Sequence, residues 1–152
     1  MNVVGEQAVR RAAKRLSSQG EEARRRARAL GESRPDLVAY VVLATEELSP
    51  AARGAAWQGL ELVCEATSAL TRPRVGLDSI IDAQAQNDDL ALAVAVAHPR
   101  FADRFLRNGG KLRQRPLLAR IANDVAGLAV GERATVFLLL KTILDVLDRP
   151  LR

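Results

Sequence analysis

The chain has 152 residues, of which 48% are hydrophobic, 27% charged and 3% aromatic, and its formal net charge is +5. These values are ordinary for one soluble globular domain, which at this length folds without disulfides. A single cysteine excludes an internal disulfide framework. No apolar run approaches the roughly 20 residues of a membrane span, and no signal-peptide core follows the first charges. We therefore expect a cytoplasmic protein, and its excess of Arg over Lys is typical of GC-rich bacterial genomes.

Residues 1–30 are expected to form a basic helical arm. Small and apolar residues recur there at alternating spacings of four and three, at Val9, Ala13, Leu16, Gly20, Ala23, Ala27 and Leu30. This pattern predicts a heptad seam that allows another helix to approach closely. Ser18 and Glu21 match a capping box, so the alternative is two helices that meet there.

The rest of the chain, residues 31–152, is expected to form the helical core domain. Caps and apolar periodicity predict helices over residues 33–48, 50–72, 77–86, 90–97, 100–108, 116–128 and 133–147. Ser49-Pro50 is a strong start signal, Asn87-Asp88 resembles a cap, and Gly109-Gly110 resembles a helix stop. Neither a strand pattern nor a repeat of fixed period is visible. The predicted fold is all-α, a compact single-domain bundle of six to eight helices with the last helix at its centre.

The arm carries the whole net charge, because it holds eight basic residues and three acids. The candidate interaction residues are Arg10, Arg11, Lys14, Arg15, Arg24, Arg25, Arg26 and Arg28. Such an excess indicates an anionic partner, either nucleic acid or an acidic protein. The structural alternative is a solvated helix face, or docking of the arm on the acidic segment 31–99 of the same chain. Bulky apolar residues are too few for a membrane-surface helix.

A second basic cluster lies in residues 100–120. It comprises Arg100, Arg104, Arg107, Lys111, Arg113, Arg115 and Arg120. Glycines beside basic residues can cradle phosphate, but pairing of the cluster with the acidic segment 31–99 is the favoured interpretation.

Residues 124–136 read Asp-Val-Ala-Gly-Leu-Ala-Val-Gly-Glu-Arg-Ala-Thr-Val, which resembles the helix-turn-helix of the lactose-repressor family. The resemblance implies that Arg133, Ala134 and Thr135 face the major groove of DNA. The apolar run over residues 137–140 instead favours a helix that is buried on nearly all sides.

Signals for catalysis are weak. His98 precedes a proline, Cys64 lies in an apolar helix, and the carboxylate pairs Glu61/Glu65 and Asp78/Asp82 lack the histidine step of a di-iron site. Phosphate-loop and dinucleotide-binding motifs are absent from the sequence. We therefore expect a protein that is not an enzyme and that holds no cofactor or metal.

Two hypotheses remain. The first is a non-enzymatic protein-interaction module that binds a protein partner or associates with itself. The alternative is a nucleic-acid-binding protein that uses the basic arm, with or without a degenerate helix-turn-helix near residues 120–138.

Overall fold

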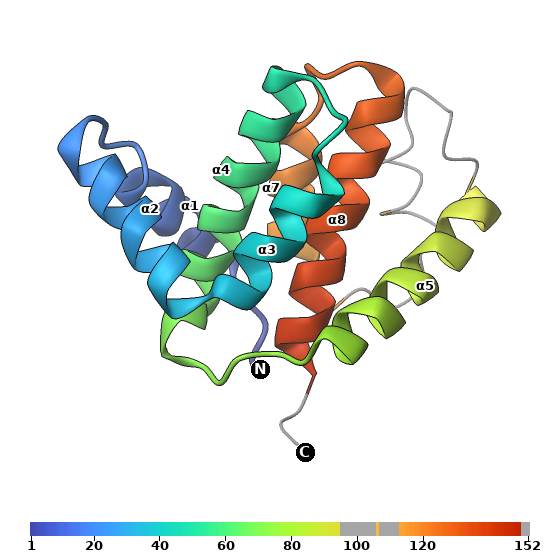
Figure 1. The fold of residues 1–152 in the computed structure, drawn as a ribbon, viewed down its shortest axis with the longest axis horizontal. Helices are drawn as coiled ribbons and strands as arrows, with labels where there is room; N and C mark the ends of the chain where they lie inside the picture. Colours follow the sequence, from blue (N-terminus) through green and yellow to red (C-terminus); the bar gives the residue numbers. More distant parts are fainter. Residues whose placement is uncertain (95–105, 107–112, 150–152) are drawn as a thin grey trace.

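Helix α8 (Val130–Asp148) runs through the middle of the fold, and the other helices are arranged around it (Figure 1). The computed structural model describes residues 1–94, 106 and 113–149. Within this part of the chain there are seven α-helices, one 3-10 turn and no strand. The other elements are α1 (Glu6–Arg15), α2 (Glu21–Ser33), α3 (Pro35–Ala44), α4 (Pro50–Thr67), η1 (Ala69–Thr71), α5 (Leu77–Val94) and α7 (Arg115–Asp124). The predicted all-α, single-domain bundle is confirmed.

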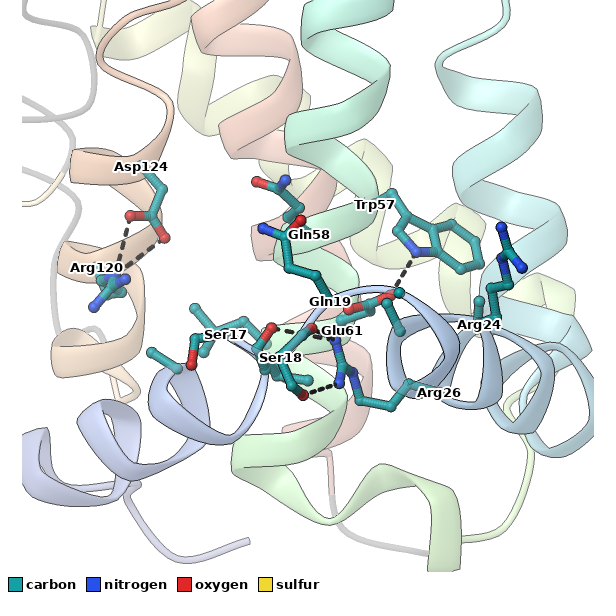
Figure 2. A pocket seen from close by; sticks show the side chains of 16 residues that line it. Ser17, Ser18, Gln19, Arg24, Arg26, Trp57, Gln58, Glu61, Arg120 and Asp124 are labelled. Carbon is teal, nitrogen blue, oxygen red and sulfur yellow. Dashed lines mark hydrogen bonds and ion pairs between the residues drawn. The ribbon is translucent and has the colours of Figure 1, made fainter.

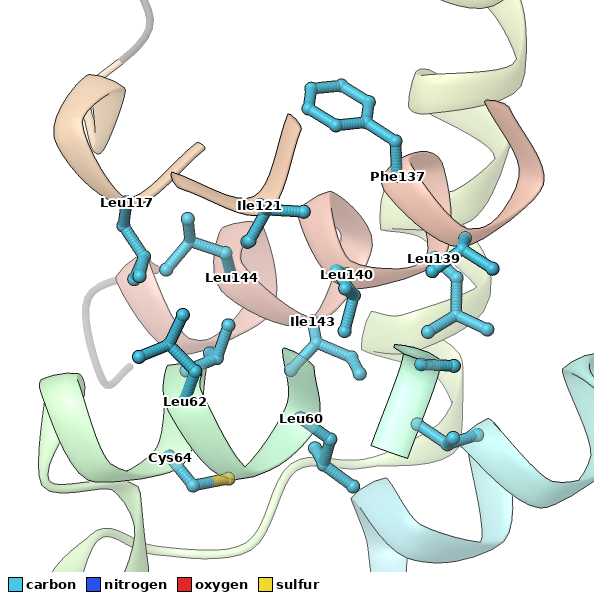
Figure 3. Packing of buried hydrophobic residues seen from close by; sticks show 14 of the residues in the cluster. Leu60, Leu62, Cys64, Leu117, Ile121, Phe137, Leu139, Leu140, Ile143 and Leu144 are labelled. Atoms are coloured by element: carbon cyan, nitrogen blue, oxygen red, sulfur yellow. The ribbon is translucent and has the colours of Figure 1, made fainter. Parts of the chain in front are cut away.

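Apolar side chains of α4, α7 and α8 form the centre of the core (Figure 3). Leu60 on α4, Ile121 on α7 and Ile143 on α8 are all buried. At the crossing of α4 and α8, Gly59 leaves room for the side chain of Leu140, which a Cβ at this position would meet. The absence of a side chain at Gly59 therefore lets the two central helices approach closely.

The start of α4 follows the predicted capping signal. The Ser49 hydroxyl accepts the backbone N–H of Ala52 at 3.2 Å, and Pro50 occupies the first turn. The Ser49 N–H and hydroxyl donate to the two carboxylate oxygens of Glu132 at 2.7 and 2.8 Å. These hydrogen bonds lower the pKa of Glu132, and they fasten the start of α4 to the first turn of α8.

Helix α3 begins at Pro35 and ends at Ala44, inside the predicted range 33–48, and Arg34 is its N-cap residue. Arg34 is fully buried, at 0% exposure. Its Nε and one Nη donate to the two carboxylate oxygens of Asp36 at 3.1 and 2.7 Å, and its other Nη donates to the carbonyl of Ala69 at 2.9 Å. Asp36 also accepts the N–H of Val75 at 2.8 Å. A buried ion pair thus joins the start of α3 to the loop that follows α4.

The helical hairpins α3–α4 and α7–α8 match at a constant offset along the chain. Buried residues occupy corresponding positions, namely Leu37 and Leu117, Val41 and Ile121, Leu60 and Leu140, and Val63 and Ile143. The N-cap residues Arg34 and Gln114 also correspond, and both are buried. The Gln114 side chain donates to Asp148 at the end of α8, as Arg34 donates to Ala69 just after α4. The expectation of no fixed repeat is therefore wrong for these hairpins, whose residues share size and burial rather than identity.

Helix α5 is continuous where the sequence predicted two helices separated by a cap. Asn87 is buried rather than capping, and its amide donates to Thr142 and Asp145 of α8, both at 3.0 Å. Its carbonyl oxygen accepts the ammonium of Lys141 at 2.8 Å, and Lys141 also pairs with Asp145 at 2.6 Å. Polar groups of α8 therefore satisfy Asn87 within the helix.

The arm is broken into α1 and α2 where the alternative predicted a break, but the predicted capping box is wrong, because Gly20 rather than Ser18 is the N-cap residue of α2 and no side chain caps the helix. Gly20 adopts φ +70° at the N-cap of α2, a backbone conformation that favours glycine. The continuous heptad seam does not form, because the chain turns between Leu16 and Gly20. Helix α1 packs on α4 and α7 through Val9 and Ala12, while α2 packs on α3. The arm thus lies against the bundle.

Other boundaries shift slightly. Helix α7 ends at Asp124 rather than near Leu128, and α8 begins at Val130 rather than Arg133. The helix predicted over residues 100–108 and its Gly109-Gly110 stop lie outside the described residues, apart from Leu106. None of the helices in the described part of the chain has the length and apolarity that crossing a bilayer requires.

Candidate functional site

The turn between α1 and α2 is held by Arg26. Its guanidinium donates to the hydroxyl and carbonyl of Ser18 at 2.7 and 2.8 Å, and to the carbonyl of Leu16 at 3.2 Å. These carbonyls follow the end of α1, where backbone acceptors lack helical partners. Arg26 therefore stabilises the turn, although the sequence placed it among the interaction residues.

Two further cations of the predicted set form ion pairs. Arg10 pairs with Glu6 one turn earlier on α1, and Arg15 pairs with Glu65 of α4 at 2.6 Å. The remaining five are exposed, and none forms an ion pair with a residue that the structure describes; they are Arg11, Lys14, Arg24, Arg25 and Arg28. We call these five residues the basic surface.

A hollow of about 770 Å³ opens beside the basic surface, between the α1–α2 turn and helices α4 and α7 (Figure 2). Arg24 and Trp57 line it, and the indole N–H of Trp57 donates to Glu61 at 2.6 Å. On its α7 side, Arg120 pairs with Asp124 at 3.0 Å. Because cations, carboxylates and an aromatic ring meet in an open hollow, its walls suit polar side chains of a protein surface.

A surface of opposite charge is formed by α5 and the turn after α3, and α3 itself adds no unpaired carboxylate to it. Six carboxylates are exposed there without an ion pair among the described residues, namely Glu46, Glu47, Asp78, Asp82, Asp88 and Asp89. Helices α3 and α5 contain neither Lys nor Arg. We call this region the acidic surface. The acidic character of segment 31–99 is visible in the sequence, but the exposure of these carboxylates was not predicted from it.

The acidic surface is also apolar. Five of the large hydrophobic residues exposed in the described structure lie on α3 and α5, namely Val42, Leu43, Leu77, Ile81 and Leu90. Between these helices and α8 is a groove of about 480 Å³, to which Tyr40, Leu138 and Leu139 contribute. Burial raises the pKa of Tyr40, whose hydroxyl donates to Gln84 at 3.4 Å. The apolar positions on α3 were a sequence signal for this surface that was missed.

The second basic cluster is not seen as a unit. Arg113 donates to the carbonyl of Met1 and pairs with Asp148, and Arg115 donates to the carbonyl of Leu106 at 2.7 Å. Arg120 forms its ion pair within α7. The other cations, Arg100, Arg104, Arg107 and Lys111, lie outside the described residues.

The segment that resembles a helix-turn-helix does not present the implied reading face. Residues 125–129 form the turn between α7 and α8, so the motif's first residues are not helical. Of the three residues implied to face DNA, Ala134 is fully buried, Arg133 is half-buried and donates to the carbonyl of Leu128 at 3.0 Å, and Thr135 is exposed. The apolar run that follows is buried in the core, as the competing interpretation predicted.

The residues considered for catalysis form contacts that stabilise the fold. Glu61 accepts the Trp57 indole, and Glu65 pairs with Arg15. Burial raises the pKa of the Cys64 thiol to about 12, so its thiolate is scarce at neutral pH. In the part of the chain that the structure describes, no group of three His, Cys, Asp or Glu side chains could hold a metal ion. His98 lies outside that part.

Comparison with known proteins adds no family or fold assignment. No known protein family, curated protein or solved structure matches the chain.

Proposed function

We propose that this protein is a non-enzymatic protein-interaction module that binds an acidic protein surface through α1 and α2. The observation that carries the proposal is the basic surface itself, whose five exposed cations have no ion-pair partner in the described structure. Because solvated cations cost little to keep and attract anionic surfaces, they promote encounter and specificity. The adjoining hollow adds Trp57 and Glu61, which suit a folded partner that presents both polar and charged side chains.

A protein partner explains this surface better than nucleic acid. Exposed Glu21, Glu22 and Glu32 lie on α2 among its cations, and a protein surface can place neutral or basic side chains opposite them, whereas a continuous row of phosphates cannot. The basic residues are not interleaved with aromatic side chains of the kind that stack on bases. The burial of Ala134 on α8 counts against the helix-turn-helix as a reading element. Nucleic-acid binding by α1 and α2 remains the competing outcome that the experiment separates.

The test measures binding of the full chain to fluorescent polyglutamate and to a short DNA duplex at several salt concentrations. We expect polyglutamate to bind at low salt and to weaken as salt rises, because exposed charges are screened. Charge reversal by Arg24→Glu with Arg28→Glu is expected to abolish binding. The matched control reverses two exposed cations on other elements, Arg53→Glu with Arg74→Glu, and is expected to retain binding.

Two results would overturn the proposal. Equal loss in both double variants would mean that net charge, rather than the basic surface, drives binding. Tighter binding to duplex DNA than to polyglutamate, with log affinity falling by about 0.9 per neutralised phosphate for each unit of log salt, would favour the nucleic-acid hypothesis.

A further inference from the structure

The two equivalent hairpins differ on their outward faces. Val42 and Leu43 of α3 are 57% and 71% exposed. The corresponding residues of α7 are Ala122 and Asn123, which are small or polar. Because α7 folds in the same hairpin without large apolar residues at these positions, the hairpin does not require them on α3. Val42 and Leu43 therefore point to a contact outside the fold.

Helix α5 carries further exposed apolar residues on the other side of the groove, whose α3 side is lined by Tyr40 and Ala44 rather than by Val42 or Leu43. Leu77, Ile81, Gln84 and Asp88 recur at helical spacing and share one face of α5. Gln84 and Asp88 line the groove opposite Tyr40 of α3, so Leu77 and Ile81 lie on the same side of α5. In Figure 1, α5 borders α8 on the side away from α1 and α2, whereas α3 lies on the α2 side of α8 and packs against both helices. The result is an open apolar groove with carboxylates at its rim.

Charge decides which occupant this surface accepts. Two acidic surfaces meeting about a two-fold axis would bring unpaired carboxylates such as Glu46, Glu47 and Asp82 together, and like charges disfavour that contact. A cationic surface is favoured instead. The same chain supplies one in the basic surface of α1 and α2, which is separate from α5 in the fold (Figure 1).

We propose that the acidic protein surface recognised by this module is its own α3–α5 face in a second copy of the chain. The basic surface of one copy lies on the acidic surface of the next, with Val42 and Leu43 buried in the contact. This inference rests on the proposed function, since it uses the same basic surface. The contact joins two different surfaces, so a pair of copies keeps one surface of each kind free, and association continues unless a ring closes.

The test is sedimentation velocity of the full chain at low salt over a range of concentrations. We expect wild type to form species larger than a dimer. A basic-surface variant, Arg24→Glu with Arg28→Glu, and an acidic-surface variant, Asp82→Asn with Asp88→Asn, are each expected to stay monomeric. An equimolar mixture of the two variants is expected to form a dimer and nothing larger. The first variant keeps the acidic surface and the second keeps the basic surface, so only one productive contact remains.

A second pair of variants tests the apolar contribution. Val42→Ser with Leu43→Ser is expected to weaken self-association about tenfold, which corresponds to roughly 1.4 kcal/mol. Circular dichroism should show unchanged helix content, because both side chains are exposed. The control Val3→Ser with Leu70→Ser changes exposed apolar residues away from α3 and α5, and is expected to associate like wild type.

The outcomes separate this inference from the proposed function. A wild-type chain that stays monomeric while binding polyglutamate through the basic surface overturns self-association and leaves the proposed function standing. A mixture of the two charge variants that stays monomeric overturns the head-to-tail contact. Retention of polyglutamate binding by the basic-surface variant overturns the proposed function, and this inference with it.

Discussion

Replacement of Arg34 by methionine tests the buried ion pair that joins α3 to the loop after α4. Methionine nearly fills the space of the arginine stem, so the change isolates the loss of the guanidinium. It leaves the Asp36 carboxylate and the Ala69 carbonyl without the donors that now lie 2.7–3.1 Å away. Removing one partner of a buried pair costs about 3–5 kcal/mol, because the other charge stays buried and uncompensated. A loss of that size is a large share of a domain's usual stability of about 5–15 kcal/mol.

The cost should depend on pH. Burial alone would raise the pKa of Asp36, but hydrogen bonds from Arg34 and Val75 outweigh it and hold that pKa below its ordinary value. In wild type, the stability that Asp36 contributes is complete above its unfolded pKa and is lost as pH falls through the lowered folded pKa. In the variant, burial is no longer opposed by Arg34, so the carboxyl protonates at higher pH. The difference in unfolding free energy between the two proteins should therefore narrow between pH 7 and about pH 4.

Urea unfolding followed by the fluorescence of Trp57, the single tryptophan, measures this difference at each pH. The matched control is the double variant Asp36→Asn with Arg34→Met, which has no titrating carboxyl at position 36. Its unfolding free energy should differ from that of wild type by an amount that depends less on pH than the difference for Arg34→Met alone. A loss of unfolding free energy below about 1 kcal/mol for Arg34→Met at pH 7 would refute the reasoning, since a surface ion pair contributes that little. A loss of unfolding free energy that does not change with pH would also refute it.

Three further predictions concern the core, the thiol and a helix start. Leu140→Ala should lower the unfolding free energy by about 2–5 kcal/mol, because it empties the space beside Gly59 at the crossing of α4 and α8; an unchanged melting temperature would contradict the central place of α8. Cys64 should react with a thiol reagent only as fast as the protein unfolds, because it is buried and its pKa is raised to about 12; reaction at the rate of free cysteine would contradict this. Ser49→Ala should cost about 0.5–2 kcal/mol in urea unfolding through loss of the helix cap at Ala52, and Ser49→Thr, which keeps the hydroxyl that caps α4 and donates to Glu132, should recover part of it.

The fold was predictable where helix signals are local. The start of α4 follows from Ser49-Pro50, because a capping hydroxyl and a first-turn proline act on neighbouring backbone groups. The apolar density of α8 likewise predicted its central position. These signals need no knowledge of the tertiary structure.

Elements that depend on distant partners were not predictable. Asn87 resembles a cap in sequence, yet Lys141 and Thr142 satisfy its side chain from another helix, so α5 continues through it. Arg34 resembles a surface cation, but it is buried because Asp36 and the carbonyl of Ala69 accept its hydrogen bonds. In both cases a partner far along the chain decides the outcome, namely α8 for Asn87 and the Ala69 carbonyl for Arg34. No local sequence pattern shows which distant groups will meet.

The candidate site was predictable in part. The sequence identified the cations of α1 and α2, but it could not separate those that are exposed from Arg26, which binds the turn, or from Arg10 and Arg15, which form ion pairs. The apolar character of the acidic surface became clear only when α3 and α5 were seen on either side of one groove.

The polar contact of α5 with α8 also has a positional consequence. A helix attached by interchangeable aliphatic side chains can slip by one turn and find similar neighbours. Asn87 has no such freedom, because an ammonium, a hydroxyl and a carboxylate meet its amide at a single height along α8. A slip by one turn would strand these groups in an apolar interface. Asn87 therefore fixes the register of α5 along α8. Because Leu77 and Ile81 belong to the same helix, their positions relative to the rest of the fold are fixed with it.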